Sequence, residues 1–167
     1  MSLFGTMSSL VGLTTAFIPA PLPGLYAVIA IPVGTILLLT ANDIVGKTGA
    51  ATFTQFVSGI ISTILPGGPP VTWIILPTWV MGGIVIDLFL YVTHQNISNS
   101  RTASGIVGFI YNIPGDLLLY WAFNTFLGWA WPFLFFLYGF IAIHAFLGGL
   151  AGILIPDILK RIKPAIR

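Results

Sequence analysis

The chain has 167 residues, of which 57% are hydrophobic and only 6% are charged, and its formal net charge is +2. Soluble domains contain about 25% charged residues, so this composition excludes a soluble globular protein, and the high hydrophobicity excludes a disordered one. The absence of Cys excludes a disulfide framework, a thiolate metal site and a Cys nucleophile. We therefore expect an integral membrane protein.

The apolar stretches, taken in chain order, predict an all-α bundle of six transmembrane helices. A bilayer core of about 30 Å needs roughly 20 apolar residues per helix, and Pro, Gly and polar residues divide the chain into six such stretches. The runs do not alternate with polar residues, which favours helices over a β-barrel. We expect helices near residues 3–18, 22–41, 50–65, 70–93, 103–126 and 129–155, and a basic tail at 156–167, in one membrane domain over 1–167.

The first stretch is the weakest of the six, because it is short and contains several Ser and Thr residues. It could be a secretory signal, but it lacks a basic start and a small-residue cleavage site. We interpret it as a short membrane helix.

The basic residues predict the orientation. In a six-helix path the second-to-third loop, the fourth-to-fifth loop and both termini lie on one side of the membrane, and all the basic residues fall on that side. A five-helix path would place Lys47 and Arg101 on the side opposite the basic tail. The positive-inside rule makes the basic side of the six-helix path cytoplasmic, so we expect both termini in the cytoplasm. The residues are Lys47, Arg101, Lys160, Arg161, Lys163 and Arg167.

The fifth stretch carries a polar stripe at four-residue spacing, formed by Asn112, Asp116, Tyr120 and Asn124. Pro114 lies inside the stripe and removes a backbone donor, so we expect the helix to be kinked or unwound just before Asp116. Two interpretations stay open. The stripe is a helix–helix hydrogen-bonding seam, or Asn112, Asp116 and Tyr120 face a substrate.

Three further polar residues fall at similar depth when helix rise is counted from the stretch ends: Gln55, Asp87 and His144. They could meet as a buried cluster that is either structural or functional. Trp79 and Trp121 lie inward of the outer turns and could line a ligand pocket, whereas Trp129 and Trp131 fit an interfacial aromatic belt.

Small residues recur at four-residue spacing in the first and last stretches, and this spacing lets helices approach closely. The pairs are Gly5 with Ser9, Ser8 with Gly12, and Gly148 with Gly152. They fit internal packing or docking to a partner subunit equally well.

No catalytic motif is complete. Gly46-Lys47-Thr48 is part of a P-loop pattern, but Ala41 stands where the first glycine is required. We expect no enzyme activity, no metal site and no cofactor.

An ordered series of segments resembles the S components of energy-coupling factor (ECF) vitamin transporters, above all the YkoE-like proteins linked to thiamine and hydroxymethylpyrimidine. Lys47 followed by Gly49-Ala50-Ala51 is similar to the family's K/R-x-G-A-A start of the third helix. The resemblance continues through 80–91, 108–112 and 148–152, and it covers roughly residues 25–160.

The resemblance implies a six-helix substrate-binding subunit in a prokaryotic plasma membrane. Its partners would be a coupling membrane subunit and two cytoplasmic ATPases. The family places a vitamin pocket near the outer face, and the small residues of the first helix (Gly5, Ser8, Ser9 and Gly12) would contact the coupling subunit. Gln55 and Ser62 stand where YkoE-like proteins carry acids, which disfavours a cationic ligand such as thiamine.

Two functions follow from this sequence. The first is a vitamin-binding transport subunit, whose heteroaromatic ligand would stack on Trp79 or Trp121 and contact Asn112, Asp116 or Tyr120, with Gln55, Asp87 and His144 as further site residues. The alternative is an accessory subunit of a membrane enzyme, because residues 76–95 loosely resemble a helix of the archaeal ammonia monooxygenase A subunit. A self-contained channel ranks last, because the polar residues lie at separate depths.

Overall fold

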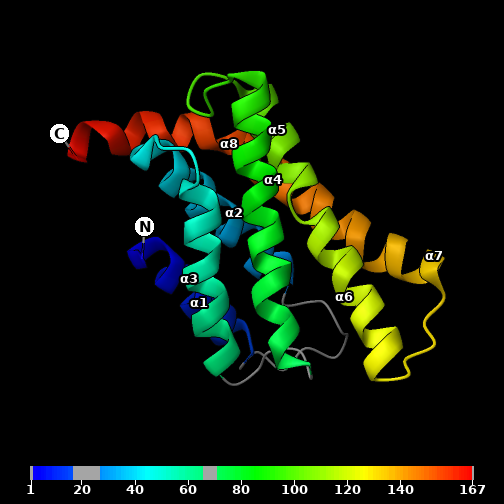
Figure 1. The fold of residues 1–167 in the computed structure, drawn as a ribbon. Coiled ribbons are helices and arrows are strands. Elements are labelled where there is room, and N and C mark those ends of the chain that lie inside the picture. Colours follow the sequence, from blue (N-terminus) through cyan, green and yellow to red (C-terminus); the bar gives the residue numbers. More distant parts are fainter. Residues whose placement is uncertain (1, 17–26, 66–70, 167) are drawn as a thin grey trace.

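The computed structural model describes residues 2–16, 27–65 and 71–166, and all regular elements in these ranges are helical (Figure 1). In chain order they are α1 (Ser2–Ala16), α2 (Ala27–Val45), α3 (Ala50–Ile64), a 3₁₀ turn (Thr72–Ile74), α4 (Ile75–Thr93), α5 (Arg101–Ile110), α6 (Ile113–Phe126), α7 (Phe133–Phe136), a π-helical turn (Leu137–Ile141) and α8 (Ala142–Ile166).

The described part of the chain contains 4 stretches that are long and apolar enough to cross a membrane: Val28–Val45, Thr72–Thr93, Arg101–Phe126 and Phe133–Ile162. α1 and α3 are apolar but shorter, with 15 residues each. The all-α class is therefore confirmed, together with these candidate spans. The count of six crossings and the side of the termini stay predictions.

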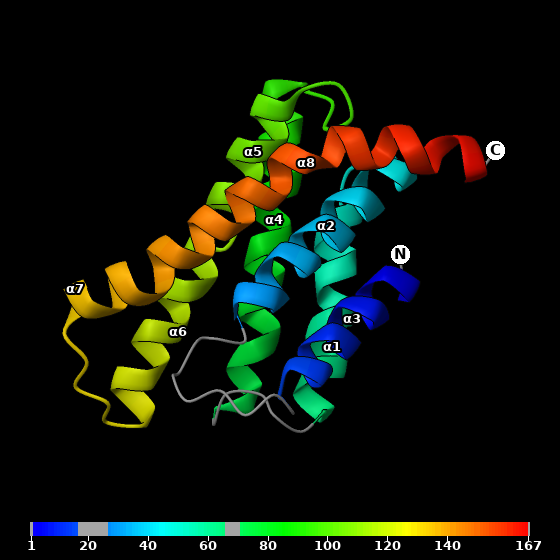
Figure 2. The ribbon, with the colours of Figure 1, turned by 180° about the vertical axis from the view of Figure 1, so that it is seen from behind.

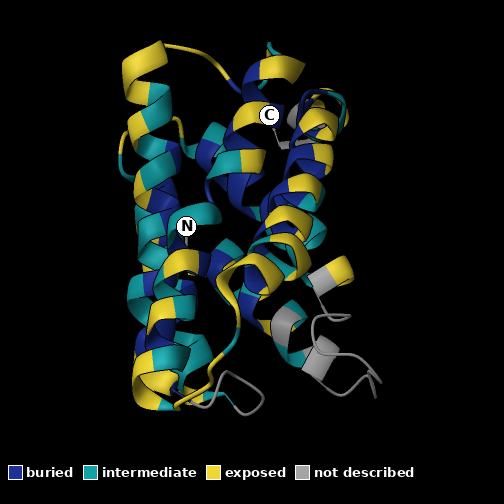
Figure 3. Ribbon diagram, turned by 90° about the vertical axis from the view of Figure 1, so that its right-hand side faces the viewer, coloured by how far each residue is buried: buried dark blue, intermediate teal, exposed yellow. Residues whose placement is uncertain are grey.

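Large apolar side chains such as Leu88, Phe135 and Leu154 are exposed on the outer surface. Figure 3 shows exposed residues along the outward sides of the helices and buried residues along their inward sides. Soluble monomers rarely expose apolar surface on this scale, so the surface fits contact with lipid.

The predicted fifth helix is interrupted at Tyr111 and Asn112, between α5 and α6. Pro114 has no N–H to donate to the carbonyl of Ile110, so the regular ladder cannot continue through this point. α6 restarts with Asp116 in its first turn, where the Asp116 N–H donates to the Asn112 carbonyl at 2.9 Å. The predicted interruption before Asp116 is confirmed.

The last predicted helix differs from the expectation at both ends. It begins at Phe133 instead of 129 and passes through the π-helical turn before α8. The expected end near 155 is wrong, because α8 includes Pro156 and Pro164 and continues to Ile166. The basic tail is thus mostly helical.

α5 and α8 approach each other until their backbones touch. A Cβ at Gly108 would collide with the carbonyl oxygen of Gly148, and a Cβ at Gly152 would collide with that of Ser104. Glycine permits this approach. The small-residue pair Gly148 and Gly152 therefore serves packing within the chain.

The small residues of α1 also face the interior. The Ser9 hydroxyl donates to the Ser58 carbonyl of α3 at 3.0 Å, and the Ser58 hydroxyl donates to the Gly5 carbonyl at 2.8 Å. Ser8 lies beside Gly34 of α2. The structure places these residues against α2 and α3, so they serve packing within the chain, and docking of a partner subunit on α1 stays a prediction. The surroundings of Gly12 lie outside the described residues.

The basic residues gather at one end of the molecule. Figures 1 and 2 show the α2–α3 turn, the α4–α5 loop and the C-terminal half of α8 at this end, with the α6–α7 connection at the opposite end. The first end carries Lys47, Arg101, Lys160 and Arg161. The side chains of Lys163 and Arg167 lie outside the described part of the chain.

Candidate functional site

A buried Asp–His pair joins the start of α6 to the start of α8. The Nδ1 atom of His144 lies 3.1 Å from Oδ1 and 3.0 Å from Oδ2 of Asp116. Both residues are only 5% exposed. Each lies in the first turn of its helix, because the chain restarts after the Pro114 interruption on one side and after the π-helical turn on the other. The carboxylate fixes the orientation and tautomer of the imidazole.

The other ring nitrogen of His144 has no hydrogen-bond partner in the part of the chain that the structure describes. Nε2 is buried and makes no hydrogen bond to the described residues, and the same holds for Nδ2 of Asn112 at the helix interruption. Buried polar atoms are nearly always hydrogen-bonded in native proteins. A polar ligand group that forms a hydrogen bond with His144 Nε2 would remove this unfavourable state.

An aromatic chain connects the α6–α7 connection to His144. The ring centroids of Trp129 and Trp131 are 5.2 Å apart, those of Trp131 and Phe136 are 6.1 Å apart, and those of Phe136 and Phe140 are 4.8 Å apart. The last contact joins Phe140 to His144 at 4.0 Å. Ring-to-ring contacts thus run from this end of the molecule to the buried pair.

The backbone irregularities lie beside the same pair. The π-helical turn Leu137–Ile141 precedes His144 and contains Phe140. Single π-helical turns inside helices often mark functional sites. The α5–α6 interruption carries Asn112, one turn before Asp116, and the Nδ2 atom of Asn112 lies beside Gly148. Asp116 and His144 each lie within about one turn of a departure from regular helix.

The polar stripe of α6 faces α7 and α8. Besides the Asp116–His144 pair, the Tyr120 hydroxyl donates to the Trp131 carbonyl at 3.2 Å, and Asn124 Nδ2 donates to the Tyr120 carbonyl at 2.8 Å. Of these three contacts, that of Asp116 joins two helices, that of Tyr120 reaches the α6–α7 connection, and that of Asn124 stays within α6. Both interpretations of the stripe stay predictions.

The predicted cluster of Gln55, Asp87 and His144 is divided in the structure. His144 pairs with Asp116. Gln55 Nε2 lies over Gly82, beside Tyr111, whose hydroxyl is 2.8 Å from the Thr35 hydroxyl. Helix rise gives depth along an axis but not rotation about it, which is why equal depth did not bring the three together.

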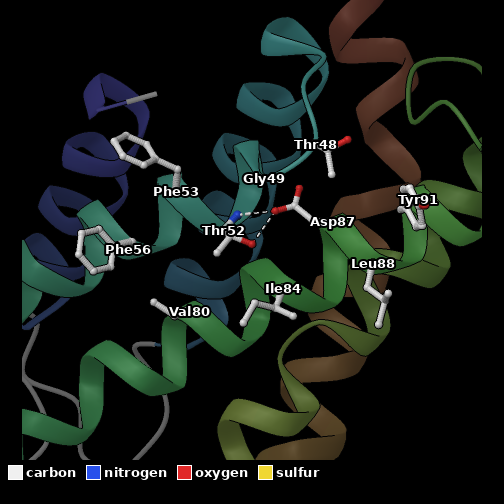
Figure 4. A pocket seen from close by; sticks show the side chains of 10 residues that line it. All are labelled: Thr48, Gly49, Thr52, Phe53, Phe56, Val80, Ile84, Asp87, Leu88 and Tyr91. Atoms are coloured by element: carbon white, nitrogen blue, oxygen red, sulfur yellow. Dashed lines mark hydrogen bonds between the residues drawn. The ribbon is translucent and has the colours of Figure 1, made fainter.

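Asp87 supplies the cap that α3 lacks. α3 begins after Gly49, which has φ 87° and offers no capping side chain. The Asp87 carboxylate of α4 instead accepts from Thr52 N at 2.8 Å and from Thr52 Oγ1 at 2.6 Å (Figure 4). It also accepts from Ala51 N at 3.3 Å. Asn42 Nδ2 of α2 donates to the same carboxylate at 3.2 Å. A carboxylate at a helix N-terminus is favourable for both its hydrogen bonds and its charge.

The site of Asp87 opens onto a surface groove of about 660 Å³ between α3 and α4. Figure 4 shows apolar side chains from both helices along it, such as Phe53, Phe56 and Ile84. The groove is apolar and open, and the oxygens of Asp87 are already engaged. This groove is therefore a weaker candidate for recognising a polar ligand than the buried pair.

The two Trp residues proposed to stack on a ligand, Trp79 and Trp121, are not among the rings of the aromatic chain that reaches His144. Trp121 is half exposed and meets Phe126 edge-on with centroids 5.5 Å apart. Trp79 is partly buried on α4. The sequence interpretation missed Trp131, Phe136 and Phe140, although the four-residue spacing of Phe136, Phe140 and His144 was a usable signal.

The described residues contain no group of three or more His, Cys, Asp or Glu that could hold a metal ion. Comparisons with protein-family models, with curated proteins and with solved structures each found no match to the chain.

Proposed function

We propose that the chain is a membrane-embedded, non-catalytic subunit that binds a small heteroaromatic solute, in the manner of an ECF S component. The single observation that carries this proposal is the buried Asp116–His144 pair, whose Nε2 atom has no hydrogen-bond partner among the described residues and lies at the end of an aromatic chain. Small-molecule sites in proteins commonly combine apolar rings with a few polar groups.

The donor and acceptor pattern indicates the ligand chemistry. When Nδ1–H donates to the Asp116 carboxylate, the Nε2 lone pair of His144 is left as an acceptor. A matching ring carries an amino or N–H donor that meets this lone pair. An aminopyrimidine such as hydroxymethylpyrimidine has this pattern and is neutral, which suits an interior in which Asp116 is already engaged.

The direction of binding follows from the two ends of the molecule. The aromatic chain starts at the α6–α7 connection, opposite the end with Lys47, Arg101, Lys160 and Arg161. If the basic end faces the cytoplasm of a prokaryotic cell, the solute enters from outside. A coupling membrane subunit and two ATPases would then drive release inward.

The test is a thermal-shift titration of the purified protein in detergent with hydroxymethylpyrimidine, thiamine and toluene. A ligand that binds only the folded state stabilises it by about 2.7 kcal/mol at 100-fold excess over its dissociation constant. We expect stabilisation by hydroxymethylpyrimidine and none by toluene, which has a ring but no polar groups.

A pair of histidine variants provides the matched control. In His144→Asn the amide nitrogen can still reach Asp116 but nothing replaces Nε2, so the variant should fold and lose the ligand response. His94 ends α4 with φ 50°, a conformation that Asn tolerates, so His94→Asn should respond like the wild type. Equal responses of both variants would refute the assigned site.

The partners need a separate test. Purification from source membranes should bring down a coupling membrane subunit and two ATPases, and added solute should stimulate ATP hydrolysis. Copurification with a redox or metal complex instead would favour the accessory-subunit alternative.

A further inference from the structure

A second surface groove, of about 520 Å³, runs between α5 and α8 on the outside of the molecule. Gly105 and Gly149 are among its lining residues, and the close helix contact at these glycines leaves it shallow. Its walls are exposed apolar side chains: Ile106 and Phe109 from α5, and Phe146, Leu150 and Ile153 from α8. Nothing in the Asp116–His144 site uses this surface.

One end of the groove is strongly basic. Arg101 lines the groove and forms an ion pair with Asp157 at 2.6 Å, with side chains 64% and 41% exposed. Asp157 also lies within electrostatic range of Lys160 and Arg161, which follow Ile153 on the same face of α8. Three cations surround one carboxylate, so this group of four residues has a surplus of two positive charges.

The dimensions fit one leaflet of a bilayer. The groove extends from Arg101 to Phe109, which is roughly 12 Å along α5 at 1.5 Å per residue. The hydrocarbon of one leaflet is about 15 Å deep, half of a 30 Å core. A chain of CH₂ groups in the groove would therefore end at the basic cluster, at the depth of a lipid headgroup.

We infer that the α5–α8 groove is a binding site for an anionic phospholipid, with one acyl chain along Ile106, Phe109 and Leu150 and the phosphate against Arg101, Lys160 and Arg161. Basic pockets between membrane helices on the cytoplasmic side select anionic headgroups. This inference is independent of the proposed solute and of any partner subunit.

The test is native mass spectrometry of the whole protein, titrated with dioctanoyl phosphatidylglycerol or dioctanoyl phosphatidylcholine. At about 1 kcal/mol per basic residue, removing one cation should weaken binding about fivefold. We expect phosphatidylglycerol to bind more tightly than phosphatidylcholine, and Lys160→Gln to weaken the former about fivefold. Lys47→Gln removes the same charge at the same end, away from the groove, and should have no effect.

A second pair of variants tests the acyl-chain path. Ile106→Trp fills the groove from an exposed position and should reduce binding of both lipids, whereas Leu117→Trp, at an exposed position on α6 outside the groove, should not. The inference is overturned if both lipids bind equally, or if Lys47→Gln matches Lys160→Gln. It is also overturned if inorganic phosphate alone displaces the lipid completely. A further contrary result would be a dimer of this chain in the native spectra that Ile106→Trp abolishes while lipid binding stays unchanged, because the groove would then be an interface between two copies.

Discussion

The capping of α3 by a neighbouring helix predicts that Asp87 is a stability residue. Asp87→Asn keeps the shape of the side chain but removes its charge and replaces one acceptor with an NH₂ group. One amide oxygen can still accept from Thr52, while the NH₂ group faces the donors Ala51 N and Asn42 Nδ2. The variant therefore loses about half of the hydrogen bonds and sets donor against donor.

The expected cost follows from the strength of such contacts. Hydrogen bonds to charged groups contribute about 1.5–3 kcal/mol, and loss of a helix N-cap costs about 0.5–2 kcal/mol. We expect Asp87→Asn to lower the free energy of unfolding by about 2–3 kcal/mol. At roughly 2–4 °C per kcal/mol for a chain of this size, the melting temperature falls by about 4–12 °C.

The assay is a circular-dichroism melt in detergent, combined with hydrogen exchange at residues 47–56. Exchange should accelerate in the first turn of α3, where the backbone donors lose their acceptor. Asp157→Asn is the matched control, because Asp157 is exposed in its ion pair with Arg101 and exposed ion pairs contribute little. If Asp87→Asn melts with the wild type and exchange at Thr52 is unchanged, Asp87 does not cap α3.

Two further predictions concern packing and topology. Gly148→Ala should lower the free energy of unfolding by about 1–3 kcal/mol through overpacking, because its Cβ would collide with the Gly108 carbonyl oxygen. Gly139→Ala is the control, because a Cβ at Gly139 meets open space and should not lower the melting temperature. Equal melting temperatures for the two variants would contradict the backbone contact. Because the chain has no Cys, single cysteines introduced at Asn99 and Ala130 can report which side of the membrane each loop faces. A membrane-impermeant maleimide should label Ala130→Cys on intact cells and Asn99→Cys only after lysis. Labelling of both variants on intact cells would contradict the six-helix path.

The helices were predictable from sequence because their signal is carried by single residues and short runs. Apolar length located the six helical stretches to within a few residues at most ends, and Pro114 revealed the break between α5 and α6. Pro156 misled, because it suggested an end to the last helix, whereas α8 continues through it. A proline costs less where tertiary packing holds the helix, and packing is not visible in a local pattern.

The site was less predictable, because it depends on which helix faces which. Asp116 and His144 were each identified as buried polar residues, but His144 was expected near Asp87. Asp87 instead accepts hydrogen bonds from backbone N–H groups of α3, and the pattern of side chains in a sequence does not reveal backbone partners. The π-helical turn before His144 was also missed, because residues 133–141 are simply apolar and aromatic.

The contact between α5 and α8 limits where a solute could leave the interior of the protein. Where Gly108 lies on Gly148 and Ser104 on Gly152, no room is left for even a methyl group. Nothing can slip sideways from the interior into the bilayer along this seam unless the two helices separate. A lateral exit, if the protein uses one, must open between other helices.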